Sequence, residues 1–166
     1  MRSLYLMRHA KAEHYSIHGD KARHLAPRGR HEAAAVGVEL ADKGIQHVLC
    51  SSSVRTRDTY DCLGLDIPVE FMDALYLGGT STLRQRISEI ADEVTALLVI
   101  GHAPSIPSLS AQLAYASEPK AADDLQCWFP TAAYAAFEIA GSWADLADES
   151  PESTRLAGVS RPSEHG

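Results

Sequence analysis

Residue types that handle phosphate follow two short apolar runs in this chain. Residues 4–7 lead into Arg8 and His9, and residues 97–101 lead into His102. Buried parallel strands read as continuous apolar runs, and open α/β sheets build their sites at the carboxyl ends of such strands. Two histidines and an arginine at two such ends therefore predict one shared site. A guanidinium fork matches phosphate oxygens, so this site would suit a phosphoryl group.

A second arginine is expected beside the same group. Residues 47–50 read as another buried strand, and Ser51-Ser52-Ser53 is typical of a helix-capping cluster. The helix predicted over residues 54–63 then carries Arg55 in its first turn. A helix N-terminus offers free N–H groups and positive potential, so Arg55 is predicted to bind the anion too.

Further elements are predicted from apolar periodicity and from breakers. Residues 27–44, 83–90 and 105–115 show helical spacing, whereas residues 67–71, 125–129 and 133–139 read as strands. Pro68 makes the first of these an edge strand. Strands alternating with helices predict a single three-layer α/β/α domain with a predominantly parallel central sheet. No segment is long enough for a large cap insertion.

Length and composition favour one globular domain. Of the 166 residues, 45% are hydrophobic and 22% are charged, which is ordinary for such a domain. We expect the domain to span residues 1–143. Residues 144–166 are small, polar and acidic, so we expect a C-terminal tail that is partly mobile, with room for one short strand.

Charge and cysteine content exclude several classes of protein. A formal net charge of −7 argues against generic nucleic-acid binding. The three cysteines show neither metal-ligand spacing nor a disulfide framework. The N-terminal apolar run is too short for a signal peptide or a membrane span, so we predict a cytoplasmic protein without a membrane partner.

Taken together, these residues resemble the histidine phosphatase superfamily, whose fold is phosphoglycerate mutase-like. The chain is most similar to the small SixA-like phosphohistidine phosphatase branch, and the match spans roughly residues 3–143. The matching residues are Arg8-His9, Asp20, Arg23, Leu25, Gly29, Ser51, Arg55, Thr59, Gly101-His102 and Pro104.

The resemblance implies a role for each of these polar residues. His9 would be the nucleophile and would form a phosphohistidine intermediate that water hydrolyses. The guanidinium groups of Arg8, Arg23 and Arg55 would neutralise the phosphoryl oxygens, and a protonated His102 would donate to one of them. The resemblance implies no metal and no cofactor. His14 and His18 have a spacing that binds metal on a helix, but no helix is predicted there.

The general acid is not obvious from the sequence. Asp20 is the best candidate by position, with Glu13 and Asp73 behind it, although Asp20 also reads as an ion-pair partner of Arg23 or as a turn residue. The leaving nitrogen of a phosphoramidate is protonated readily, so it needs less help than an alkyl phosphate. A missing strong acid therefore favours phosphohistidine as the substrate.

We therefore expect a metal-independent phosphatase whose partner is a phosphorylated substrate, specifically a protein that carries phosphohistidine. Two alternatives stay open: a phosphatase of small phosphoesters or nucleotides, and a phosphate-binding module without turnover. The aromatic pair Trp128-Phe129 reads either as core or as the rim of the pocket.

Overall fold

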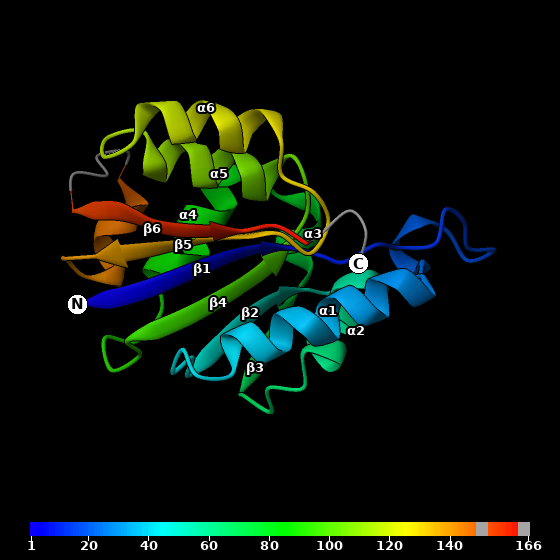
Figure 1. The fold of residues 1–166 in the computed structure, drawn as a ribbon. Helices are drawn as coiled ribbons and strands as arrows, with labels where there is room; N and C mark the ends of the chain where they lie inside the picture. Colours follow the sequence, from blue (N-terminus) through cyan, green and yellow to red (C-terminus); the bar gives the residue numbers. More distant parts are fainter. Residues whose placement is uncertain (149–152, 163–166) are drawn as a thin grey trace.

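A six-stranded sheet runs through the centre of the molecule, in the order β3-β2-β4-β1-β5-β6 (Figure 1). The structure is a computed structural model, and it describes residues 1–148 and 153–162. The strands are β1 (Arg2–Arg8), β2 (His47–Ser51), β3 (Val69–Met72), β4 (Ala96–Gly101), β5 (Tyr134–Ile139) and β6 (Thr154–Ser160). The helices are α1 (Pro27–Leu40), α2 (Val54–Leu63), α3 (Asp73–Leu77), α4 (Thr80–Ser88), α5 (Ser105–Ala114) and α6 (Pro119–Cys127), with 3-10 turns η1 (Asp20–Ala22) and η2 (Trp143–Ala147).

The strands β3, β2, β4 and β1 are mutually parallel, and β5 and β6 add an antiparallel edge. The prediction of a predominantly parallel α/β fold is confirmed. In the register between β1 and β4, Arg8 lies opposite Gly101. The next residue of each strand is a histidine, so His9 and His102 leave the sheet side by side.

Each face of the sheet has its own apolar core, because side chains of a strand alternate between faces. Leu4 and Leu6 of β1 pack in the core beneath α4, α5 and α6. Tyr5 and Met7 pack in the opposite core, which α1 and α2 cover. Figure 1 shows these two helical layers on either side of the sheet. The three-layer arrangement that we predicted is therefore present.

The strand predicted over residues 125–129 is wrong. That segment is the end of α6 and the loop that follows it. Pro119 starts the helix at a position where proline is tolerated, and Ala122 and Leu125 bury one helical face while their polar neighbours stay exposed. Short apolar runs do not distinguish strand from helix by themselves.

Part of the expected C-terminal tail packs on the domain. The turn η2 buries Trp143, and β6 pairs with β5 along the sheet edge. Residues 149–152 and 163–166 of the tail lie outside the described residues, and the domain boundary at residue 143 stays a prediction. Among the residues that the structure describes, no helix is long and apolar enough to cross a bilayer.

Candidate active site

The end of β1 fixes the orientation of the His9 imidazole. The His9 backbone N–H donates to the Gly101 carbonyl at 2.9 Å, which ties this residue to β4. Its ring atom Nδ1 lies 2.7 Å from the carbonyl oxygen of Ala10. A carbonyl only accepts hydrogen bonds, so Nδ1 carries the hydrogen and Nε2 keeps its lone pair. This tautomer is the one that an Nε2 nucleophile needs.

A chain of contacts from α2 holds the Ala10 carbonyl in place. The Ala10 N–H donates to Thr59 Oγ1 at 3.0 Å, and that hydroxyl donates to the Arg55 carbonyl at 2.7 Å. Helix α1 closes on the same turn at Gly29, where a Cβ atom would lie only 2.0 Å from the Lys11 carbonyl oxygen. The turn after β1 is therefore fixed by two helices.

His102 enters the site from the end of β4. Its ring centroid lies 5.3 Å from that of His9, and its Nε2 atom lies 2.8 Å from the Ser51 hydroxyl oxygen. Its Nδ1 atom is buried and has no hydrogen-bond partner among the described residues. A buried ring nitrogen of this kind is ready to bind an oxygen of a ligand.

The two predicted arginines approach the histidines from different elements. Arg8 Nη1 donates to the Phe129 carbonyl at 2.9 Å, and Arg55 Nη1 donates to the Asp20 carbonyl at 3.0 Å. The Nε atoms of Arg8 and Arg55 are buried, and neither has a partner within the described part of the chain. Unpaired guanidinium N–H groups beside an imidazole suit a phosphoryl group well. The structure thus brings Arg8, His9, Arg55 and His102 together.

Burial and positive charge keep both histidines neutral. Burial is the main cause that lowers the pKa of His9 to about 3, and His102, Arg55 and Arg8 lower it further against the Ala10 contact. Burial and Arg55 likewise lower the pKa of His102 to about 4. Neutral His9 is the reactive form for attack. The protonated His102 that the resemblance implies requires a bound dianion, which raises a histidine pKa.

Comparisons with known proteins agree with this geometry. A family model, described as "Histidine phosphatase superfamily (branch 1)", matches residues 4–76. An uncharacterised protein of Mycobacterium tuberculosis is 38% identical over 144 residues, which cover 84% of this chain and 91% of that protein. A solved structure from Nakamurella multipartitia, assigned as phosphohistidine phosphatase SixA, is 32% identical with a TM-score of 0.87, covering 97% of this chain and 96% of the other. The chain belongs to the histidine phosphatase superfamily.

Within the superfamily, the chain falls in the SixA-like branch. A second structure, from Agrobacterium tumefaciens and also assigned as SixA, is 25% identical with a TM-score of 0.77 and covers 97% of this chain and 98% of the other. The fold is phosphoglycerate mutase-like, and the family relationship supports a phosphatase that hydrolyses a phosphorylated substrate.

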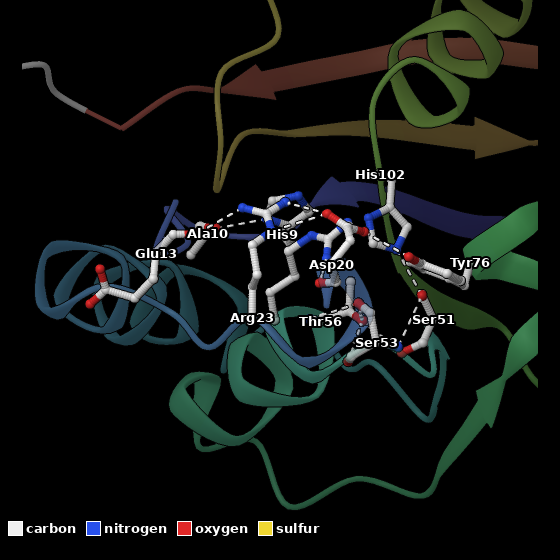
Figure 2. A network of polar contacts seen from close by, with 11 residues as sticks. His9, Ala10, Glu13, Asp20, Arg23, Ser51, Ser53, Thr56, Tyr76 and His102 are labelled. Carbon is white, nitrogen blue, oxygen red and sulfur yellow. Dashed lines mark hydrogen bonds and ion pairs between the residues drawn. The ribbon is translucent and has the colours of Figure 1, made fainter. Parts of the chain in front are cut away.

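Asp20 of this histidine phosphatase lies in a polar network beside the histidines (Figure 2). Its carboxylate accepts from Arg23 Nε at 3.0 Å, from Arg55 Nη2 at 3.2 Å and from the Tyr76 hydroxyl at 2.6 Å. The Tyr76 hydrogen bond is the main cause that lowers the pKa of Asp20 to about 2, with help from Arg55 and Arg23. These contacts tie the Asp20 carboxylate to Arg23, Arg55 and Tyr76, and the general-acid role of Asp20 stays a prediction.

Glu13 and Asp73 are the other two candidates for the general acid. Glu13 uses its backbone carbonyl to accept from Arg23 at 2.7 Å, and its carboxylate points away from the histidines (Figure 2). The exposed Asp73 carboxylate pairs with Lys21 Nζ at 2.9 Å. The Glu13 carboxylate therefore does not lie where it would protonate a leaving group, and the Asp73 carboxylate is occupied by its ion pair with Lys21.

Arg23 joins the site through Asp20, since its guanidinium bridges that carboxylate and the loop after β1. His14 and His18 are exposed in the same loop. Within residues 1–148 and 153–162, no group of three histidine, cysteine, aspartate or glutamate side chains is arranged to hold a metal ion.

Sequence reasoning missed Tyr76 as a site residue. The Tyr76 ring lies 5.6 Å from the His102 ring in an edge-on arrangement, and its hydroxyl reaches Asp20. Tyr76 belongs to α3, a helix of five residues without apolar periodicity. No sequence signal marks it, because its place depends on how α3 packs beyond the end of β3.

Proposed function

We propose that this protein is a metal-independent phosphohistidine phosphatase in which His9 is the nucleophile. The observation that carries the proposal is the contact between His9 Nδ1 and the Ala10 carbonyl, which leaves the Nε2 lone pair free. The lowered pKa keeps that nitrogen unprotonated at neutral pH. Guanidinium groups supply the positive charge, so the proposal assigns no step to a metal ion.

The first step transfers the phosphoryl group to the enzyme. The Nε2 lone pair of His9 forms a bond to phosphorus, and the P–N bond to the substrate imidazole breaks. The electron pair of that bond moves to the leaving nitrogen, which takes a proton from solvent. Arg8 and Arg55 stabilise the charge on the transferring oxygens, and His102, protonated in the presence of the dianion, donates to one of them.

The second step releases inorganic phosphate. Water attacks phosphorus, the P–N bond to His9 breaks, and its electron pair returns to Nε2. The proton of the attacking water leaves to solvent. Splitting one displacement into two steps is the general advantage of covalent catalysis.

The lack of a protonated carboxyl group beside the histidines, among the described residues, supports a phosphoramidate substrate. Asp20 is ionised, the Glu13 carboxylate points away from the histidines, and the Asp73 carboxylate pairs with Lys21. An imidazole nitrogen is basic enough to accept a proton from water as it leaves, whereas an alkoxide needs a positioned acid. The two SixA structures point to the same substrate class, because both are assigned as phosphohistidine phosphatases.

Phosphate release from phosphoramidate and from phosphohistidine tests the proposal. We expect turnover that EDTA does not reduce, and an acid-labile, alkali-stable phosphoenzyme that is trapped by rapid quenching. His9→Ala should abolish both turnover and phosphoenzyme, whereas the matched change at an exposed histidine of α1, His31→Ala, should change neither.

Each alternative predicts a different outcome. Faster release from sugar phosphates or nucleotides than from phosphoramidates would favour a phosphatase of small phosphoesters. Binding of phosphate without turnover of any substrate would indicate a phosphate-binding module. Activity that persists in His9→Ala would show that His9 is not the nucleophile.

A further inference from the structure

Two hollows flank the catalytic groups and share one wall. A hollow of about 320 Å³ lies next to Arg8, and a second of about 520 Å³ lies next to His102. Ala103, Pro104 and Ser108 line both of them, so the two hollows form one continuous surface. We call this surface the Pro104 trough. Its lining includes Arg8, Trp128 and Phe129 in one hollow and Tyr76, Leu77 and His102 in the other.

The trough has almost no charge, although 22% of the residues in the chain are charged. Arg8 is its only arginine, and neither a lysine nor a carboxylate is among its lining residues. The chain as a whole has 37 such charged residues, from 15 Lys and Arg and 22 Asp and Glu. A ligand that carries a carboxylate or a second phosphate besides the phosphoryl group would find no lysine or arginine in the trough other than Arg8.

Each hollow also exposes a large apolar side chain. Trp128 is 51% exposed in the hollow beside Arg8, and Leu77 is 82% exposed in the hollow beside His102. The Arg161 guanidinium lies 4.6 Å from the Trp128 ring centroid and donates to the Trp128 carbonyl, which steadies this tryptophan. Phe129, by contrast, is buried as core. Exposed aromatic and aliphatic anchors next to a polar centre are typical of protein interfaces.

We propose that the Pro104 trough docks the polypeptide that carries the phosphohistidine, with uncharged and apolar side chains on both sides of that residue. This inference rests on the proposed function, and it adds where the phosphoprotein docks and which side chains flank its phosphohistidine. The phosphoryl group occupies the site between His9 and His102, and the flanking side chains contact Trp128 on one side and Leu77 on the other. One hollow of the trough is lined by Arg8 and the other by His102, so both adjoin the phosphoryl site, as a polypeptide substrate requires.

Kinetics with matched probes test the proposal. The probes are phosphoramidate and two short peptides, each phosphorylated on a single histidine, one with leucine and alanine flanks and one with glutamate flanks. We expect the wild-type protein to prefer the apolar peptide. Trp128→Ala and Leu77→Ser should each raise KM for that peptide about tenfold, the loss typical of an interface anchor, and should leave the rate on phosphoramidate unchanged.

A matched control lies on the opposite side of the sheet. Val38 of α1 is 78% exposed and lies outside the trough, so Val38→Ser should change neither KM nor kcat. Unchanged phosphoramidate turnover shows that each variant is folded.

The outcomes separate the two proposals. Normal phosphoramidate turnover together with an unaltered peptide KM in Trp128→Ala and Leu77→Ser would overturn the docking surface alone. A preference for the glutamate-flanked peptide would overturn it as well. Failure of the wild-type protein to release phosphate from phosphoramidate would overturn the proposed function, and the docking surface with it.

Discussion

The phosphoryl site and the loop above it are held in different ways. The first, which we call the cradle, comprises Arg8, His9, Arg55 and His102. It is held by backbone groups at strand ends and by buried hydroxyls. The second, which we call the rim, comprises Asp20, Lys21, Arg23, Asp73 and Tyr76. It is held mainly by contacts between exposed or half-exposed side chains.

This difference indicates how much the cradle and the rim each contribute to catalytic activity. Buried groups are fixed and little screened, so the cradle can stabilise charge strongly. Contacts on the rim are exposed to solvent, and such pairs stabilise a structure only weakly. We therefore expect changes in the cradle to reduce activity strongly, and changes in the rim to adjust it.

The largest effect is expected at Arg55. Arg55→Ala removes a buried guanidinium from the phosphoryl group, and kcat/KM for phosphoramidate should fall by about 10²–10³-fold, as when one donor to a transition-state oxyanion is lost. Arg55→Lys should recover only part of this loss, because an ammonium lacks the planar fork. The matched control is Arg57→Ala, an exposed arginine two residues along α2. Equal losses of kcat/KM in Arg55→Ala and Arg57→Ala would show that Arg55 does not bind the phosphoryl group.

The next largest effect is expected where α2 supports the turn after β1. Thr59→Val keeps the shape of the side chain and removes the hydroxyl that accepts from Ala10 N–H. A buried N–H without a partner costs about 2 kcal/mol, so the free energy of unfolding in urea should fall by that amount. The His9 ring loses its fixed carbonyl partner, so kcat should fall while KM changes little. A stable variant with normal kcat would show that this contact does not position His9.

The cradle histidines should make stability depend on pH. Their pKa values are about 3 and about 4 in the folded protein, against 6.5 for an unperturbed histidine. The unfolded state therefore binds more protons below pH 6.5, and the free energy of unfolding falls as the pH is lowered. Each histidine should remove about 1.5 kcal/mol between pH 6.5 and about pH 5.

Urea denaturation of the wild-type protein and of His102→Asn over this pH range measures that contribution. The slope of stability against pH should be shallower in the variant, because one of the two buried imidazoles is gone. Identical slopes would mean that His102 titrates normally in the folded protein.

The sequence predicted the cradle better than the rim, and the reason is physical. His9 and His102 follow apolar strands, and parallel strands end at one edge of a sheet, so their meeting depends only on the fold class. Arg55 follows from the same reasoning, since a helix start after β2 lies at that edge. The roles of these residues in catalysis stay a prediction.

The rim depends on tertiary contacts that leave little trace in the sequence. Asp20 accepts hydrogen bonds from Arg23, Arg55 and Tyr76, and its acidity depends most on Tyr76, which no motif singles out. The helix α6 was missed for a related reason. Its apolar residues are few, and only packing against α5 shows that they form a helical face.

The smallest effect is therefore expected at Tyr76. Its size tests whether the Tyr76 hydroxyl positions Asp20 or is a surface contact without effect on activity. Tyr76→Phe keeps the ring beside His102 and removes the hydroxyl that donates to Asp20. Losing this donor should raise the pKa of Asp20 above about 2, which a carbon-13 NMR titration of the carboxyl group measures. The Asp20 carboxylate then holds Arg55 less firmly, so kcat/KM should fall about threefold, the scale of one exposed hydrogen bond.

Tyr15, which is 77% exposed in the loop after β1, gives the control: Tyr15→Phe should leave both readouts unchanged. An unshifted Asp20 pKa in Tyr76→Phe would show that the arginines alone keep this carboxylate ionised.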